Sequence, residues 1–315
     1  FCVGLQKTLR DQKFFLETQE PNLMLFLDLV ALGTACDIMP LTPINRAFIQ
    51  NGLKVLESPQ ANLGLQTLLT IAKKYQKTPL EIHNLSFILG PRINAGSRIS
   101  DSMLGANLLT TDNPTEAFIY GDKLNALNIE RQQLEKKILT EALEHAQKRH
   151  ALSPCIVLVE KKWHQGIIGI IASRIKDLYH QPTFIISASH GILKGSGRSV
   201  PGVHLGKIVN KAVQKGLLLA GGGHAQAAGI SLTEENLPHF EIFLQKELQS
   251  FTYKPILNIS AVVDPHLLTL EYAESLERLK PFGPQNTEPV FMLPYLQIET
   301  LSPLGTEHYR MILRS

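Results

Sequence analysis

Three features of this 315-residue sequence predict an α/β fold divided into several parts. Apolar residues recur at helical spacing through one long segment from Pro114 to about His150. Between residues 153 and 252, short apolar runs alternate with helical segments, which is typical of an α/β domain. After Pro255 strand-like runs predominate, as in a partial β-barrel. The domain boundaries expected from these changes are 1–112, 113–152, 153–252 and 253–315.

Residues 1–60 are expected to be helical, followed in 61–112 by helices interrupted at Pro79 and by a loop at 90–98, whose sequence is GPRINAGSR. Pro114 near the start of the long helix and Ser153-Pro154 after it are suitable boundaries, so this helix is expected to connect two compact regions.

The α/β part begins with a strand and contains a glycine-rich loop at 221–223, immediately before the last strand. Its expected strands are 155–160, 183–187, 192–199 and 229–232, and its expected helices are 167–179, 204–215 and 235–249. Strands at 256–263, 290–300 and 309–313 and one helix at 270–279 are expected in the final part.

Composition excludes few functions. The chain is 44% hydrophobic and 19% charged, as in ordinary globular proteins, and its net charge of +3 means that any nucleic-acid site must be a local basic patch. No apolar run approaches the roughly 20 residues of a membrane helix, so no membrane partner is expected. Three cysteines without metal-ligand spacing indicate buried thiols in a reducing cytoplasm. The chain starts at Phe1 without a signal peptide and reads as a piece of a longer protein.

Asp37 ends the apolar run LDLVALGTAC and is a candidate ligand for a hard divalent cation. The structural alternative is an N-cap or turn aspartate before Pro40. One carboxylate cannot form a two-metal centre, because such a centre clamps ions about 3.5–4 Å apart with several ligands.

Several glycine-containing segments carry residues that suit a phosphate. Gly221, Gly222 and Gly223 can turn backbone N–H groups toward an anion, with His224 at their edge. The alternative is a turn that needs three glycines for steric reasons. Arg92 and Arg98 could each fork onto a phosphate, or could simply be solvated or ion-paired.

Ser196 and Arg198 lie two positions apart in KGSGRS, so an extended strand would place both on one face; a simple β-turn is the alternative. His164 precedes a helix, whose N-terminus favours anions, although a structural histidine would fit there equally. The recurrence of such segments favours a track for a phosphate backbone over a single nucleotide pocket.

These motifs resemble those of a known family. Residues 221–229, GGGHAQAAG, resemble the signature of the DHHA1 domain of the DHH phosphoesterase superfamily, and WHQGIIGIIASR (163–174) and KGSGRS (194–199) resemble its RecJ branch. DLVALGTACDIMPL (28–41) with Asn45-Arg46 resembles the fourth DHH motif, and GPRINAGSR is also RecJ-like. FGPQNTEP (282–289) resembles the beginning of that family's OB-fold. The earlier motifs, including Asp-His-His, are absent, and Cys36 stands where a small aliphatic residue is expected.

The resemblance implies the end of a DHH domain, a connecting helix, a DHHA1 domain and a partial OB-fold. It implies a 5′→3′ exonuclease specific for single-stranded DNA in repair and recombination, using Mn²⁺ or Mg²⁺ in a two-metal mechanism. Asp37 would be the last aspartate ligand, and Ser196, Arg198, His224 and the arginines of GPRINAGSR would hold phosphates. A single-strand-binding protein and a repair helicase are the expected protein partners, and the expected location is the cytoplasm.

Two other functions fit the same residues. A non-catalytic nucleic-acid-binding scaffold could keep the DHHA1 and OB parts without chemistry. A DHH enzyme acting on short oligonucleotides or cyclic dinucleotides is the second alternative, and the OB-like end argues against it. If the missing metal ligands lie outside this sequence, the chain by itself is expected to be inactive.

Overall fold

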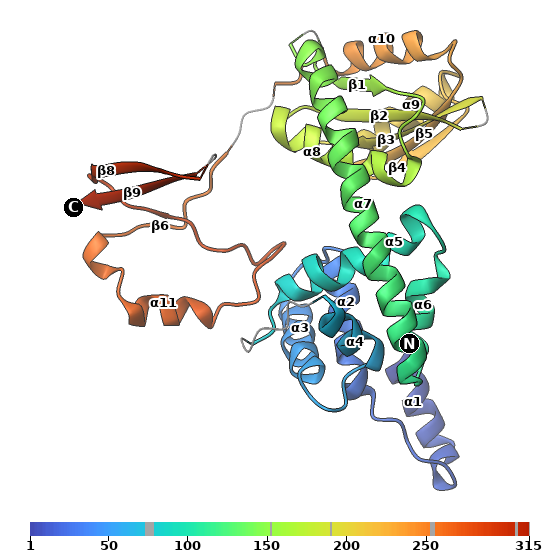
Figure 1. Cartoon of the computed structure of the whole chain (residues 1–315), viewed down its shortest axis with the longest axis vertical. Helices are drawn as coiled ribbons and strands as arrows, with labels where there is room; N and C mark the ends of the chain where they lie inside the picture. Colours follow the sequence, from blue (N-terminus) through green and yellow to red (C-terminus); the bar gives the residue numbers. More distant parts are fainter. Residues whose placement is uncertain (73–78, 152, 190, 253–255, 306–307, 315) are drawn as a thin grey trace. The chain divides into compact units, whose positions relative to one another are not determined.

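The computed structural model describes residues 1–72, 79–151, 153–189, 191–252, 256–305 and 308–314 (Figure 1). Its contacts divide the chain into two units. Unit 1 comprises Phe1–Leu69, Lys73–Gly90 and Ile256–Ser315, and unit 2 comprises Thr70–Ala72 and Pro91–Pro255. The expected boundaries at residues 152 and 253, and Pro255, lie outside the described residues.

Unit 1 begins with helices, as expected: α1 (Cys2–Asp11), α2 (Leu27–Cys36), α3 (Pro43–Leu56) and α4 (Leu63–Ile71), with 3₁₀ turns at Phe14–Leu16 and Leu23–Phe26 and a π-helical segment at Asn84–Leu89. Helices α2 and α3 approach each other closely at Gly52, where a Cβ would lie 2.2 Å from the carbonyl oxygen of Leu27. Glycine is therefore needed at this position. The buried carboxylate of Asp28 accepts the backbone N–H groups of Leu29 and Asn62, both at 2.7 Å, and so ties α2 to the start of α4.

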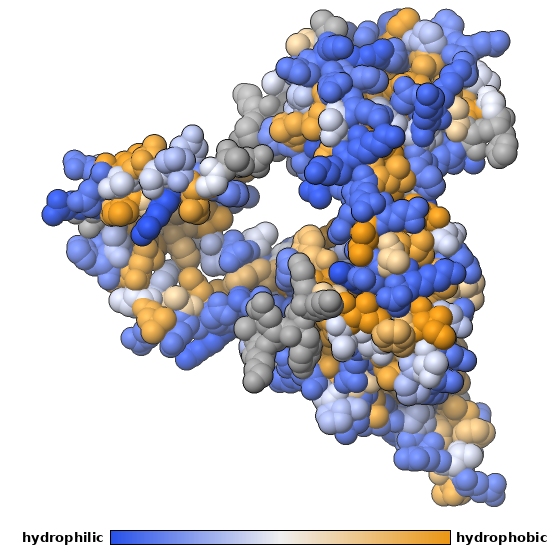
Figure 2. Space-filling view, viewed as in Figure 1, coloured by the Kyte–Doolittle hydropathy of each residue, from blue (hydrophilic) through white to orange (hydrophobic). Residues whose placement is uncertain are grey.

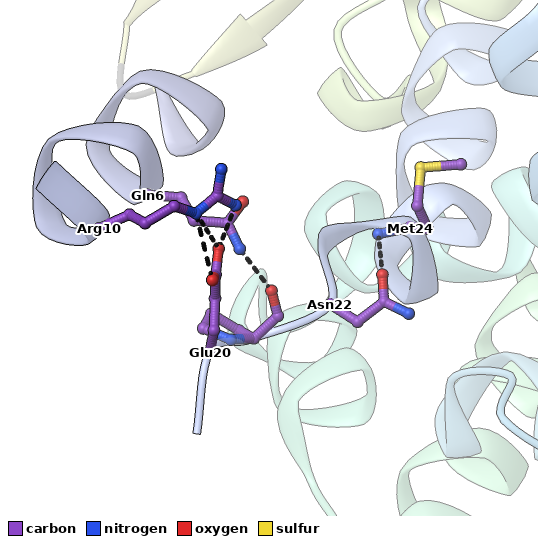
Figure 3. Close-up of polar contacts among 6 residues, drawn as sticks. Gln6, Arg10, Glu20, Asn22 and Met24 are labelled. Carbon is purple, nitrogen blue, oxygen red and sulfur yellow. Dashed lines mark hydrogen bonds and ion pairs between the residues drawn. The ribbon is translucent and has the colours of Figure 1, made fainter. Parts of the chain in front are cut away.

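The segment after α1 folds back beside it. Arg10 forms an ion pair with Glu20, and Gln6 Nε2 donates to the carbonyl oxygen of Pro21 at 2.6 Å (Figure 3). Asn22 then accepts the backbone N–H of Met24 at 3.1 Å and caps the second 3₁₀ turn.

The C-terminal part of unit 1 is strand-rich, as expected, but the described residues form two separate two-stranded sheets and no closed barrel. Strand β6 (Ala261–Val262) pairs with β7 (Phe291–Met292), and β8 (Gln297–Leu304) pairs with β9 (His308–Arg314). The strand expected at 256–263 is shortened to β6, and the strand expected at 290–300 is divided between β7 and the start of β8, which pair with different partners. Helix α11 (Leu270–Glu277) lies between β6 and β7 in the sequence. Apolar side chains of β8 and β9 are exposed on this hairpin (Figure 2).

Unit 2 contains α5 (Gly90–Ile99), α6 (Met103–Thr110) and the long helix α7 (Pro114–Arg149), which runs from these helices to the sheet (Figure 1). Helix α7 confirms the expected long helix. The side chain of Asn113 caps it by accepting the N–H of Thr115 at 2.9 Å, and Pro114 occupies the first turn, where an absent N–H costs nothing.

The sheet of unit 2 has the order β1-β2-β3-β5-β4, with β1 and β2 parallel and the other pairs antiparallel. Its strands are β1 (Ile156–Val159), β2 (Thr183–Ser189), β3 (Ile192–Arg198), β4 (Ala220–Gly223) and β5 (Ala227–Leu232). Helices α7 and α8 (Gln165–Tyr179) pack on one face, and α9 (Leu205–Gln214) and α10 (Leu237–Leu248) pack on the other. The alternation of β2 follows from this, because Phe184 and Ile186 join the α9 side and Ile185 the α8 side.

Two local expectations were wrong. The loop expected at 90–98 is helix α5, which follows the π-helical segment directly. Pro91 lies in the first turn of α5, where a helix tolerates proline. The loop expected at 221–223 is the edge strand β4, since Gly221 and Gly222 pair with Ile230 and Gly229 of β5. Glycine and proline were interpreted as loop signals in both places, and tertiary pairing overrode them.

Within the part of the chain that the structure describes, no helix has both the length and the apolar character needed to cross a membrane.

Candidate phosphate-binding cleft

Strand β3 presents two different faces. Cβ atoms on Gly195 and Gly197 would lie within 3 Å of core side chains, so these positions face α9, and Lys194, Ser196 and Arg198 face the α8 side. Arg198 Nη1 donates to Ser196 Oγ at 3.0 Å and to the carbonyl oxygen of Gly197 at 2.9 Å. The predicted shared face of Ser196 and Arg198 is confirmed, and the alternative of a simple β-turn is wrong.

Beside Ser196, the sheet has a floor without side chains. The register aligns Ser196 with Gly229 on β5 and Gly229 with Gly222 on β4, so the three residues face the same side. A Cβ on Gly229 or Gly222 would meet no heavy atom within 4 Å, and neither residue has a positive φ. Nothing in the described part of the protein therefore requires glycine at these two positions, whereas a ligand lying on the sheet would.

At the other two positions of the triplet, Gly221 and Gly223, the fold requires glycine for steric reasons, as one of the two interpretations of the sequence predicts. A Cβ on Gly221 would lie 2.7 Å from Val209 Cγ1, so Gly221 lets α9 pack closely. Gly223 has φ of +156°, and its Cβ would lie 2.2 Å from the carbonyl oxygen of Ala227. The fold therefore requires glycine at Gly221 and Gly223, whereas Gly222 has open space above it that a ligand could occupy.

Arg98 reaches this face from the end of α5. Its Nη1 donates to the carbonyl oxygen of Gly166 at 3.2 Å, and a Cβ on Gly166 would lie 2.0 Å from the carbonyl oxygen of Arg98. A Cβ on Gly169, one turn further along α8, would lie 3.0 Å from Arg198 Nη2. The two glycines of α8 therefore make room for the two arginines.

Arg98, Ser196, Arg198 and Gly229 line a cleft of about 700 Å³. Helix α5 contributes Ser97 and Arg98, and α8 contributes Gln165, Gly166, Ile168 and Gly169; the sheet contributes Lys194, Gly195, Ser196, Arg198, Ala220, Gly221, Gly229, Ile230 and Ser231. All of them belong to unit 2.

Positive charge is concentrated here. Burial and the neighbouring charge of Arg98 lower the pKa of Arg198. Burial, followed by the charge of Arg131, lowers the pKa of Arg98, and Glu135 opposes this shift. Arg131 is itself buried, and it donates to Asn128 Oδ1 and to Glu135 Oε2, the latter at 2.7 Å. Guanidinium groups remain charged despite such shifts, so the cleft favours an anion.

Five predicted binding residues do not line the cleft: Arg92, His164, Gly222, Gly223 and His224. Arg92 is half-buried, its pKa is lowered by burial, and its Nε donates to Asn125 Oδ1 at 3.0 Å. His164 caps α8, because its Nδ1 accepts the N–H of Gly166 at 3.1 Å. His224 is exposed in the turn between β4 and β5 and accepts the N–H of Gln226 at 3.3 Å.

Sequence reasoning missed four polar residues of the cleft, one of which is Ser97 near the end of α5. Lys194 and Ser231 face each other in the β3–β5 register, and Gln165 lies at the start of α8. The alternation of side chains along a strand, which placed Ser196 and Arg198 on one face, also places Lys194 on that face, so the sequence could have predicted this residue. Ser231 could be found only from the register.

Asp37 lies in unit 1 as the C-cap of α2, where its N–H donates to the carbonyl oxygen of Gly33 at 3.0 Å. An N-cap role is therefore wrong. The carboxylate is exposed and accepts no hydrogen bond from the described residues. A negative charge at a helix C-terminus costs about 0.3–1 kcal/mol, which a bound cation would offset. Burial, followed by the charge of Asp37, raises the pKa of the neighbouring Cys36.

A metal centre needs more ligands than this. Among the residues that the structure describes, no group of three or more His, Cys, Asp or Glu side chains could hold a metal ion. Asp37 suits a single ligand position, and the described residues do not make a complete site.

Comparisons with known proteins agree with the motifs. Residues 152–250 match the DHHA1 domain, and residues 259–315 match the RecJ OB domain. The single-stranded-DNA-specific exonuclease RecJ of Escherichia coli is 37% identical over 305 residues, covering 92% of this chain and 52% of that protein. RecJ of Dickeya dadantii is 35% identical over 302 residues, with the same coverage of 92% and 52%.

Among solved structures, RecJ from Thermus thermophilus in complex with Mn²⁺ has a TM-score of 0.81 at 31% identity, covering 93% of this chain and 43% of that chain. The chain spans about half the length of the curated relatives it matches. The chain therefore carries a DHHA1 domain and a RecJ OB domain, and it is similar to RecJ exonucleases along 92% of its length.

Proposed function

We propose that the protein carrying this chain is a metal-dependent exodeoxyribonuclease that degrades single-stranded DNA in the 5′→3′ direction during repair and recombination. The observation that carries this proposal is the cleft of unit 2, where Arg98, Ser196 and Arg198 meet beside a glycine floor. Both reported relatives are named single-stranded-DNA-specific exonucleases, which supports single-stranded DNA as the substrate.

In the proposed reaction the cleft holds the DNA backbone. Arg198 Nη2 donates to no acceptor in the described part of the chain, so it is available to a phosphate oxygen, while Nη1 keeps Ser196 Oγ in place. Arg98 adds a second charge, and its packing against Gly166 fixes its position. These donors hold the strand and offset negative charge that develops on the phosphate.

The metal chemistry is assigned to Mn²⁺ or Mg²⁺, and Asp37 would hold one such ion. A bound divalent ion lowers the pKa of water and offsets phosphate charge. The other ligands are proposed to come from the part of RecJ proteins that this chain does not match. We therefore expect the pure chain to bind single-stranded DNA without degrading it in Mn²⁺, and measurable degradation would overturn this assignment of ligands.

The parts of the chain have distinct proposed roles. Residues 1–112 are the end of the DHH domain with a helical extension, 113–152 are the connecting helix, 153–252 are the DHHA1 domain, and 253–315 are part of the OB-fold. The OB part would supply stacking and charge for the single strand. We place the enzyme in the cytoplasm, with a single-strand-binding protein and a repair helicase as partners.

The two alternatives differ in what they bind. A non-catalytic scaffold would use the same cleft, and only activity of a protein with all metal ligands separates it from a nuclease. An enzyme for short oligonucleotides would not need an OB domain, so the match at 259–315 favours long single strands.

The experiment that tests the cleft measures binding of a short, 5′-phosphorylated, fluorescent oligothymidylate at low salt. Arg198→Ala is expected to weaken binding at least about tenfold, and Arg198→Lys to restore it only in part, because a lysine cannot fork onto a phosphate. Lys215→Ala is the matched control, since this exposed lysine ends α9 on the opposite side of the sheet. Equal affinity of Arg198→Ala and the parent chain would refute the proposal.

A further inference from the structure

A second polar row crosses the sheet next to the row of Ser196. The register aligns Lys194 with Ser231 on β5 and Ser231 with Ala220 on β4, and all three residues line the cleft. Lys194 is two residues from Ser196, so their Cα atoms are about 6.7 Å apart on the same face of the strand. This is close to the spacing of successive phosphates in an extended nucleic-acid strand.

The ammonium group of Lys194 and the hydroxyl of Ser231 make no ion pair or hydrogen bond with the described residues. Lys194 is exposed and has no carboxylate within ion-pair distance among the described residues, although ion pairs elsewhere in unit 2 engage Lys161, Lys176 and Lys211. The hydroxyl of Ser231 likewise has no hydrogen-bond partner in the described part of the chain. A solvated lysine would be unremarkable alone, but this one shares a cleft with two arginines that already favour an anion.

We propose that Lys194 and Ser231 form a second phosphate subsite, one nucleotide along the strand from the subsite of Arg198 and Ser196. This inference rests on the proposed function, because it takes the first subsite as given. The ligand is a nucleic-acid strand with at least two successive phosphates, and a mononucleotide fills only half of the site.

The glycine floor leaves space beside the first subsite for the nucleoside that joins the two phosphates. Gly229 stands beside Ser196, two residues from Ser231 on the same face of β5, and the space above it is open to 4 Å. A sugar or a base can therefore approach the peptide backbone there, while one phosphate binds at Ser196 and Arg198 and the next binds at Lys194. The strand β3 would then run along the DNA backbone and set its register.

Calorimetry with two small probes tests this subsite on the full chain. Thymidine 5′-monophosphate carries one phosphate, and thymidine 3′,5′-bisphosphate carries two that are one nucleoside apart. The parent chain is expected to bind the bisphosphate at least about tenfold more tightly. Lys194→Ala is expected to remove this advantage and to leave the affinity for the monophosphate within about twofold. Lys215→Ala, which removes the same charge from the other side of the sheet, should change neither affinity.

Salt dependence gives an independent readout with oligothymidylate. Loss of one phosphate contact on a single strand lowers the slope of log Kobs against log salt by about 0.7, and Lys194→Ala should show this change. Equal effects of Lys194→Ala on both small probes, or none on either, would overturn the second subsite. If the parent chain binds neither probe, nor oligothymidylate, the proposed function fails instead.

Discussion

Gly229 offers the sharpest test of whether the floor of the cleft is kept open for a ligand. It lies in β5, is exposed, lacks a positive φ and has no heavy atom within 4 Å of the position a Cβ would take. Gly229→Val would therefore place two methyl groups over the floor, between Ser196 and Gly222, without meeting protein atoms near its Cβ.

The expected magnitudes have opposite signs for stability and for binding. Glycine within a strand costs roughly 0.5–1 kcal/mol relative to alanine, and valine favours strands, so the free energy of unfolding should stay equal or rise by up to about 1 kcal/mol. Affinity for single-stranded DNA should fall at least about tenfold, or about 1.4 kcal/mol, because the side chain occupies the ligand's place.

Urea denaturation and fluorescence anisotropy with labelled oligothymidylate measure the two quantities on the same preparation. Gly197→Ala is the comparison, since its Cβ would lie 2.6 Å from Phe184 Cε1 and 2.7 Å from Leu205 Cδ2. Overpacking of this kind costs about 1–3 kcal/mol of stability. A Gly229→Val variant that binds DNA like the parent chain, or that loses stability as Gly197→Ala does, would refute an open floor.

Two further predictions concern the support of the site and the thiols. Gly166→Ala should cost about 1–3 kcal/mol of unfolding free energy and also weaken DNA binding, because its Cβ would lie 2.0 Å from the carbonyl oxygen of Arg98; unchanged melting and binding would contradict the packing described here. Burial raises the pKa of the Cys155 thiol, so the folded chain keeps a proton that the unfolded chain releases. The free energy of unfolding should therefore fall above about pH 8.5, by up to ~1.4 kcal/mol per pH unit from this group, and Cys155→Ala should lose that part of the slope in urea titrations. The same slope in both proteins would rule out Cys155 as its source.

The sequence allowed those elements to be predicted whose signals are local. The periodic apolar residues and the Pro114 boundary were sufficient for α7, and the alternation of β3 was sufficient to place Ser196 and Arg198 together. Glycine and proline misled at 90–98 and 221–223, because a proline at a helix start and glycines in an edge strand look like loops without their tertiary partners.

The rest of the cleft depends on contacts between distant segments. No local pattern links Arg98 to Gly166, and the alignment of Ser231 with Lys194 follows only from the register of β3 with β5. The distinction between Gly222, which is open, and Gly221 and Gly223, which the fold requires, likewise needs the positions of Val209 and Ala227. Motif resemblance indicated the family, while geometry divided the motif into structural and ligand-facing residues.

The most direct measurement is a crystal structure of this chain with a 5′-phosphorylated, single-stranded oligothymidylate. Our account predicts a phosphate within hydrogen-bond distance of Arg198 Nη2 and Ser196 Oγ, with the strand lying over Gly229. An ordered strand bound elsewhere on the chain, with the cleft between α5, α8 and β3 free of DNA, would contradict it.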